Sequence, residues 1–224
     1  MTLTLHHHPL SSFCHKVLVA LYENGTPFTH HVVNLGDPDA RAAFLAMWPV
    51  GKIPVLRDEG RGQTVPETSV IIEYLDLHHP GPHPLLPADK AQQLEVRLWD
   101  RFFDQYVQGP MQKIVGDRLR PDGQRDPRGV EEAVAGLRKA YDMLEDRMTT
   151  RTWAAGDAFS LADCAAAPAL FYAGIVSPFP AGHVHLAAYF ERLMDRPSVR
   201  RVIDEARPYF AMFPFKDDIP ARFL

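Results

Sequence analysis

The chain has 224 residues, of which 46% are hydrophobic and 23% are charged, and its formal net charge is -4 at pH 7. These values are ordinary for a folded globular protein, and the length allows one large domain or two modest ones. The slightly acidic charge argues against nucleic acid as a partner, and no apolar run is long enough to predict a membrane span. Two cysteines, Cys14 and Cys164, indicate reduced thiols, and no signal peptide is recognisable, so we expect a cytoplasmic protein.

The N-terminal third of the chain alternates between strand-like and helical patterns. Apolar side chains alternate over 3–7 and recur at helical spacing over 12–23, which predicts a strand followed by a helix. A second strand is expected over 27–33, and Asp37-Pro38 provides the start of a second helix. This βαβ beginning requires parallel strands joined by a right-handed crossover.

The segment from Trp48 to Leu75 predicts a hairpin followed by a helix. It reads Trp-Pro-Val-Gly-Lys-Ile-Pro-Val-Leu, then a turn, then Val-Pro-Glu-Thr-Ser-Val-Ile-Ile-Glu-Tyr-Leu. We expect strands over 53–57 and 63–65 and a helix that begins at Glu67. The element order becomes βαβαββα, which is the order of a thioredoxin-like domain.

Two features of this segment indicate a ligand site. A cis bond before Pro54 would turn the N–H and C=O of Ile53 out of the sheet, where they can pair with an extended peptide. The helix that begins at Glu67-Thr68 offers free N–H groups and the positive end of its dipole, which suit a carboxylate. Together they predict a site for a small anionic peptide, although Glu67 and Thr68 could also serve as a plain helix cap.

The proline-rich stretch from His79 to Pro87 marks a boundary between two domains. After it the sequence keeps a helical period, which predicts helices over 88–119, 130–148, from 160 onward, 183–195 and 199–206. The first is expected to bend or break at Gly109-Pro110. The third carries a capping box between Ser160 and Asp163.

Both halves of the Trp48–Leu75 segment resemble the glutathione-binding motif of cytosolic glutathione transferases. The resemblance implies an α+β protein, with a thioredoxin-like glutathione-binding domain (1–79), a linker (80–87) and an all-helical domain (88–224). It implies that the Ile53 backbone beside Pro54 binds glutathione and that Glu67 and Thr68 take the ammonium and carboxylate of the γ-glutamyl end. Lys52 could pair with the glycine carboxylate, or be an ordinary surface lysine. Trp48 replaces an Asn that is common in the family. Its side chain could pack in the core, reach the cleft or form a dimer contact.

The stretch Leu10-Ser-Ser-Phe-Cys-His-Lys-Val17 joins the first strand to the first helix. Ser11 and Cys14 stand where a Cys-x-x-Cys motif has its two cysteines, so dithiol exchange is not available. The pattern Ser-Ser-x-x-x-Lys-Val resembles serine-type transferases of the theta and zeta classes, although Cys14 and the residue before it depart from the zeta motif. In that motif the first serine activates the thiol, which implies this role for Ser11. The alternatives are Ser12 as the donor, Cys14 as a mixed-disulfide site, or serines that merely cap the helix.

A serine hydroxyl can supply the chemistry that the glutathione thiol requires. A free thiol has a pKa of roughly 8.5, and lowering it by about two units requires ~2.7 kcal/mol of preferential thiolate stabilisation. A hydrogen bond donated to a charged sulfur contributes about 1.5–3 kcal/mol, and a helix N-terminus about 0.3–1 kcal/mol. Ser11 is therefore expected to act as a hydrogen-bond donor and to keep its proton.

The long helix carries an aromatic stripe, with Trp99, Phe102, Phe103 and Tyr106 at helical spacing. Most such stripes are core. The resemblance implies that this helix faces the electrophile pocket, so we expect Phe102, Phe103 and Tyr106 to line it. The histidines near the N-terminus have no cysteine or carboxylate at ligand spacing, so no metal site is predicted.

The sequence therefore predicts a glutathione transferase with a role in detoxification. Glutathione is the expected co-substrate, and its thiolate attacks a small apolar electrophile. The resemblance implies a homodimer, and no nucleic acid or membrane partner is expected. Two alternatives stay open: a glutathione-dependent cis–trans isomerase of the maleylacetoacetate type, and a non-catalytic binding module with the same fold.

Overall fold

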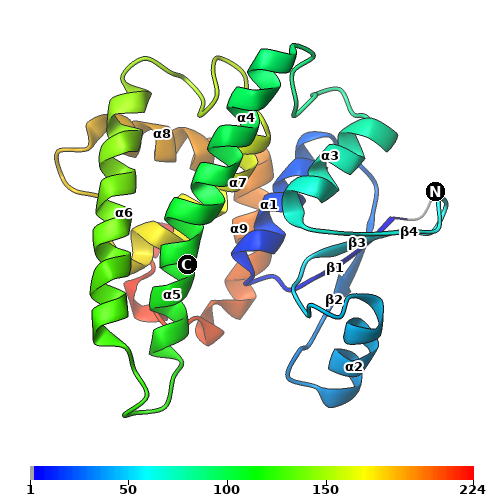
Figure 1. Cartoon of the computed structure of the whole chain (residues 1–224), viewed down its shortest axis with the longest axis horizontal. Coiled ribbons are helices and arrows are strands. Elements are labelled where there is room, and N and C mark those ends of the chain that lie inside the picture. Colours follow the sequence, from blue (N-terminus) through cyan, green and yellow to red (C-terminus); the bar gives the residue numbers. More distant parts are fainter. Residues whose placement is uncertain (1–2) are drawn as a thin grey trace. The chain divides into compact units, whose positions relative to one another are not determined.

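The computed structural model describes residues 3–224. The chain divides into two compact units, the first ending at Leu86 and the second beginning at Pro87. The first unit contains a four-stranded mixed sheet with helices, and the second is entirely helical (Figure 1). The predicted α+β class and the βαβαββα order of the first unit are confirmed.

The sheet of the first unit has the strand order β2-β1-β3-β4. Its strands are β1 (Leu3–His7), β2 (Thr29–Val32), β3 (Val55–Asp58) and β4 (Gln63–Pro66). β2 runs parallel to β1, whereas β3 is antiparallel to both β1 and β4. The third strand begins two residues later than predicted, because the Ile53–Pro54 bond is cis and the ladder starts at Val55. The second strand is also shorter than predicted.

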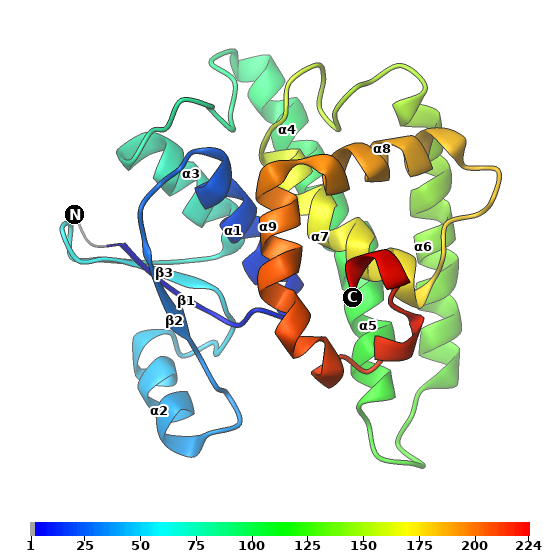
Figure 2. The same ribbon diagram turned by 180° about the vertical axis from the view of Figure 1, so that it is seen from behind.

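Three helices flank this sheet, with α1 (Ser12–Glu23) and α3 (Thr68–His78) on one side and α2 (Pro38–Met47) on the other (Figures 1 and 2). The alternation of β1 buries its apolar side chains, and the apolar faces of α1 and α3 complete the core. A second cluster of Val33, Phe44 and Val55 is covered by Met47, Trp48 and Ile53. Trp48 is therefore part of the packing around α2.

A buried carboxylate ties the β3–β4 hairpin to the end of α3. Asp58, only 1% exposed, accepts hydrogen bonds from Tyr74 Oη (2.9 Å), His79 Nε2 (2.7 Å) and the Arg61 N–H (3.1 Å). Burial raises the pKa of Asp58, but the hydrogen bonds from His79 and Tyr74 outweigh it and hold the pKa below its ordinary value. This arrangement fixes the hairpin that positions β4 and the start of α3.

The helical unit consists of several α-helices followed by short turns. Its helices are α4 (Lys90–Phe102), α5 (Gly109–Arg118), α6 (Pro127–Met148), α7 (Leu161–Val176), α8 (Val184–Asp195) and α9 (Pro197–Ala206). The C-terminal tail forms 3-10 turns at η2 (Arg207–Met212), η3 (Lys216–Asp218) and η4 (Ala221–Phe223). Helix α7 is the central one, since 14 of its 16 residues are buried.

The long helix of this unit is interrupted by a π-helix rather than broken at Gly109-Pro110. The segment η1 (Phe103–Gln108) adopts the wider turn, and the Gly109 N–H bonds to the Asp104 carbonyl five residues back. Because Pro110 has no N–H to continue the ladder, the wider turn accommodates the displaced carbonyl groups. The interruption falls where a bend or break was predicted, since α5 begins at Gly109, but it takes the form of a π-helix.

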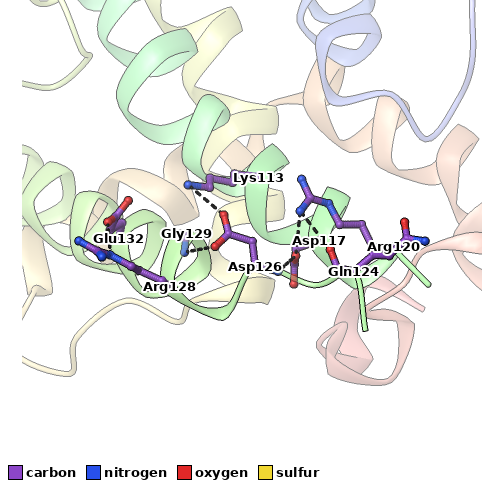
Figure 3. Close-up of polar contacts among 8 residues, drawn as sticks. All are labelled: Lys113, Asp117, Arg120, Gln124, Asp126, Arg128, Gly129 and Glu132. Carbon is purple, nitrogen blue, oxygen red and sulfur yellow. Dashed lines mark hydrogen bonds and ion pairs between the residues drawn. The ribbon is translucent and has the colours of Figure 1, made fainter. Parts of the chain in front are cut away.

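Helix α6 begins three residues before its predicted start. Asp126 is its N-cap and accepts a hydrogen bond from the Gly129 N–H (2.8 Å), while Pro127 occupies the first helical position. Lys113 Nζ lies 3.9 Å from the other Asp126 oxygen (Figure 3). Pro197 likewise begins α9, whereas the prediction placed it between helices.

The predicted capping box at the start of α7 is confirmed. Asp163 is fully buried and accepts hydrogen bonds from the Ser160 N–H (2.9 Å), Ser160 Oγ (3.0 Å), the Ala154 N–H (2.8 Å) and Tyr189 Oη (2.6 Å). Burial raises the pKa of Asp163 despite these donors. The carboxylate joins the loop before α7 to α7 and α8, so its role here is structural.

Candidate functional site

The sheet register brings three predicted site segments to one end of the first unit. His6 near the end of β1 pairs with Val55 at the start of β3, and Val55 pairs with Pro66 at the end of β4. The turn after β1 leads to Ser11, the residue before β3 is Pro54, and the residue after β4 is Glu67. These segments, separated in sequence, therefore emerge at the same edge of the sheet.

Ser11 is the N-cap of α1. Its Oγ accepts a hydrogen bond from the Cys14 N–H at 3.4 Å, which is long for a hydrogen bond. A hydroxyl that accepts one bond keeps its O–H as a donor. Within the described residues, Ser11 bonds to backbone groups and to Cys14 rather than to an imidazole or carboxylate. These contacts are compatible with a hydrogen-bond donor, and the role of Ser11 toward a thiol stays a prediction.

The two alternatives to Ser11 are both buried. Ser12 is 2% exposed and Cys14 is 0% exposed. Burial raises the pKa of the Cys14 thiol to about 12, although a hydrogen bond with the Ser11 side chain acts in the opposite direction. Cys14 is therefore a protonated thiol at neutral pH, and its burial makes mixed-disulfide exchange unfavourable.

The second segment presents its backbone rather than its side chains. The Ile53–Pro54 bond is cis, as the motif predicts, and both residues lie outside the strand ladder. The Ile53 side chain packs toward the cluster that includes Phe44. Lys52, next to Ile53, is exposed. Both alternatives for it, a ligand contact and an ordinary surface lysine, stay open.

The third segment has an unusual backbone. Glu67 has φ 68° and ψ 119°. Within residues 3–224, every other residue with positive φ is a glycine. Glu67 is the N-cap of α3, yet its side chain forms no capping hydrogen bond and is exposed. Thr68 follows and is 7% exposed. Positive φ is unfavourable for a residue with a Cβ, and strain of this kind concentrates at ligand sites.

The lysine of the Ser-Ser-x-x-x-Lys-Val pattern, to which the sequence assigns no role, contacts the first turn of α3. Lys16 is 1% exposed, and its Nζ donates a hydrogen bond of 3.0 Å to Ser69 Oγ. Ser69 directly follows Thr68, so the ammonium lies close to the end of α3 that suits an anion. The available signal was a charged residue among the apolar positions of the first helix.

The aromatic stripe belongs to the helical unit. Phe102 is 6% and Phe103 0% exposed, whereas Tyr106, which lies in the π-helix, is 57% exposed. The rings of Trp99, Phe102 and Tyr106 form a continuous series, with centroids 4.7 and 5.5 Å apart. Tyr106 is therefore the member of the stripe most able to meet a ligand, and the assignment of all three to an electrophile pocket stays a prediction.

Residues 3–224 show neither a metal-binding cluster nor a membrane-spanning helix. Residues 3–224 contain no group of three or more histidine, cysteine, aspartate or glutamate side chains placed to hold a metal ion. The N-terminal histidines instead pair across β1 and β2, with His7 Nε2 3.1 Å from His30 Nδ1. Over the same residues, no helix is long and apolar enough to cross a membrane.

Comparisons with known proteins agree with this geometry. Residues 5–83 match the glutathione S-transferase N-terminal domain model, and residues 104–197 match the C-terminal domain model. FtsZ-localized protein A of Caulobacter vibrioides is 30% identical over 224 residues, with 96% of this chain and 97% of that protein covered. Glutathione S-transferase GstB of Escherichia coli is 27% identical over 194 residues, or 84% of this chain and 91% of that protein.

Among solved structures, a glutathione S-transferase from Methylobacillus flagellatus with glutathione bound superposes with a TM-score of 0.80. It is 28% identical, and the match covers 89% of this chain and 98% of the other. The similarity extends through both units of the chain.

Proposed function

The chain belongs to the glutathione S-transferase family, and from that premise we propose that it binds glutathione and transfers its thiolate to a small apolar electrophile. The binding half of the proposal rests on one observation. The cis Ile53–Pro54 segment and the strained Glu67 N-cap lie at the same end of the sheet as Ser11.

The binding mode follows from the chemistry of each segment. The extended cysteinyl part of glutathione pairs with the Ile53 backbone, and the γ-glutamyl carboxylate takes the hydroxyl and N–H of Thr68 at the start of α3. Glu67, exposed and without a capping bond, takes the α-ammonium. Lys52 is the candidate partner of the glycine carboxylate.

The catalytic group in this proposal is the Ser11 hydroxyl. A bound thiolate replaces the neutral Cys14 thiol as the acceptor of the Ser11 O–H, because a charged acceptor forms the stronger hydrogen bond. The thiolate then forms a carbon–sulfur bond with the electrophile as the leaving group departs or a double bond accepts the electron pair. Holding thiolate and electrophile together supplies a further rate gain through proximity. We propose that Tyr106, with Phe102 and Phe103 behind it, contributes to electrophile binding.

Calorimetry and turnover assays test this proposal. Glutathione is titrated into the full chain, and turnover is then measured with a halogenated nitroaromatic and with maleylacetoacetate. Saturable binding with conjugation of the nitroaromatic supports the transferase. Isomerisation of maleylacetoacetate without conjugation of the nitroaromatic would contradict the transferase and support the isomerase.

A second candidate is a non-catalytic binding module with the same fold. It is favoured by the 30% identity to a relative whose name refers to localisation with FtsZ. Absence of glutathione binding in calorimetry would favour this module over the transferase, whereas turnover of any electrophile would contradict it.

We also propose, from family membership, that the chain acts in detoxification as a cytoplasmic homodimer. Sedimentation equilibrium on the full chain tests the dimer. A single species with the mass of one chain, 25.3 kDa, at micromolar concentration would contradict it.

A further inference from the structure

A cavity of about 270 Å³, open at the surface of the helical unit, lies between α7, α8 and the C-terminal turn η4. Figure 2 shows that turn, drawn in red, in front of α7. All of its lining residues belong to this unit, whereas Ser11, Ile53 and Glu67 belong to the other. The cavity is therefore built from different elements than the proposed thiol site.

Four aromatic rings form the walls of this cavity. Phe171 on α7 meets Phe223 of the tail edge to face, with centroids 5.1 Å apart, and Phe179 meets Phe190 in the same manner at 5.4 Å. Edge-to-face pairs expose both ring faces and ring edges, which are the surfaces that a further aromatic ring prefers to contact.

Small residues keep the space between these rings open. Gly174 on α7 has no Cβ, and one added there would lie 3.3 Å from the Phe179 ring. Ala187, on the facing side of α8, is exposed and lines the cavity with a single methyl group. A larger side chain at Ala187 would project into the space that a ligand needs.

The charged groups at the rim neutralise each other. Arg222 donates two hydrogen bonds to Glu191, one to each carboxylate oxygen, at 2.6 and 2.7 Å. The same guanidinium lies over the Phe223 ring, 4.6 Å from its centroid. A charged ligand would have to separate this pair, so the rim favours an uncharged one.

We propose that this cavity is a further ligand site, which takes a small uncharged molecule of one or two aromatic rings. Its volume lies between that of a cavity of about 150 Å³ that holds benzene and the roughly 300–1,000 Å³ of sites for drug-sized ligands. The site goes beyond the proposed transferase activity and does not depend on it.

Binding of 2-naphthol to the full chain, followed by fluorescence anisotropy at neutral pH, tests the site. The variant Ala187→Phe fills the cavity, and Ala188→Phe adds the same ring to the next residue of α8, which is exposed and does not line it. We expect saturable binding that Ala187→Phe weakens by at least about tenfold, or about 1.4 kcal/mol, while Ala188→Phe changes it by less than about twofold. The smaller Ala187→Leu gives the same reading if Ala187→Phe does not fold.

Two further titrations locate the site and test its chemistry. Saturating glutathione is expected to leave the affinity for 2-naphthol unchanged, and 2-naphthoate is expected to bind more weakly than 2-naphthol because Arg222 is already paired. Three results would overturn the proposal: no saturable binding of 2-naphthol, an equal loss of 2-naphthol affinity in Ala187→Phe and Ala188→Phe, or competition between glutathione and 2-naphthol.

Discussion

Lys16 and Ser69, 53 positions apart in the sequence, are joined by a hydrogen bond of 3.0 Å from Nζ to Oγ. The bond connects α1, which begins beside Ser11, to the first turn of α3, which follows Glu67. A lysine side chain beside the first turn of a helix favours an anion at that helix end. We propose that Lys16 acts as a positioning residue that links the two halves of the proposed glutathione site.

Replacing Lys16 by Met should weaken glutathione binding more than it slows turnover. Loss of the positive charge near the start of α3 is expected to raise the Kd for glutathione about tenfold, or about 1.4 kcal/mol, with a smaller change in kcat at saturation. Calorimetry and steady-state kinetics give the two values separately.

The conservative variant Lys16→Arg separates charge from packing. It keeps the positive charge and should recover part of the lost affinity, even if the larger side chain lowers Tm. If Lys16→Met lowers Tm but leaves the Kd for glutathione unchanged, Lys16 serves the fold alone.

Ser11→Ala should lower kcat by about ten- to a hundredfold, because it removes a hydrogen bond to a charged sulfur of about 1.5–3 kcal/mol. The KM for glutathione should change little, since the backbone and the α3 terminus hold the peptide. Ser11 also caps α1, so the variant should lose about 1 kcal/mol of stability as well.

Asp37→Ala is the matched control for that second effect. Asp37 caps α2 in the same unit through a 2.8 Å bond from the Ala40 N–H and has no place in the proposed site. It should cost similar stability while leaving kcat unchanged. Equal losses of kcat in both variants would assign the Ser11 effect to capping alone.

Asp58 should make the stability of the protein depend on acid pH. Its folded pKa lies below the unfolded value of about 3.9, so the carboxylate stabilises the fold above that pH and the contribution disappears as the pH falls through the folded pKa. Asp58→Asn should therefore lower the free energy of unfolding at neutral pH by about 1–3 kcal/mol and flatten its decline in acid.

Urea unfolding at neutral pH and at about pH 3 measures this dependence, with Asp122→Asn as the control. The Asp122 side chain is 97% exposed, so its replacement should leave the pH dependence as in the wild type. If the free energy of unfolding of Asp58→Asn falls between neutral pH and about pH 3 as much as that of the wild type, other carboxylates cause the acid dependence.

Asp163→Ala should destabilise the helical unit far more than loss of an ordinary cap. Four donors bond to the buried Asp163 carboxylate, and leaving them without an acceptor should cost at least about 3 kcal/mol. Asp126→Ala, which removes an N-cap at the start of α6, should cost about 1 kcal/mol. Thermal unfolding compares the two, and equal shifts in Tm would contradict the role assigned to Asp163.

The fold could be predicted wherever local signals agree with one another. The capping box of Ser160 and Asp163 and the cis bond at Pro54 follow from short motifs, and both are present in the structure. The π-helix before Pro110 could not be predicted, because it depends on how the helix ladder adapts to the missing N–H.

The candidate site shows the same division. The positions of Ser11, Pro54 and Glu67 at one sheet edge agree with the predicted thioredoxin-like element order, but the sheet order that brings them together is seen only in the structure. The bond from Lys16 to Ser69 depends on the packing of α1 against α3, and neither helical pattern contains that information. The strained φ of Glu67 likewise reflects the chain path between β4 and α3 rather than a preference of glutamate.

The pKa of the bound glutathione thiol tests the central claim most directly. It is measured from the thiolate absorbance of the glutathione complex as a function of pH, for the wild type and for Ser11→Ala. We expect the wild type to lower the thiol pKa by about two units from its free value of roughly 8.5, and Ser11→Ala to return most of that shift. A bound thiol with the same pKa in both proteins would contradict the assignment of Ser11 as the group that holds the thiolate.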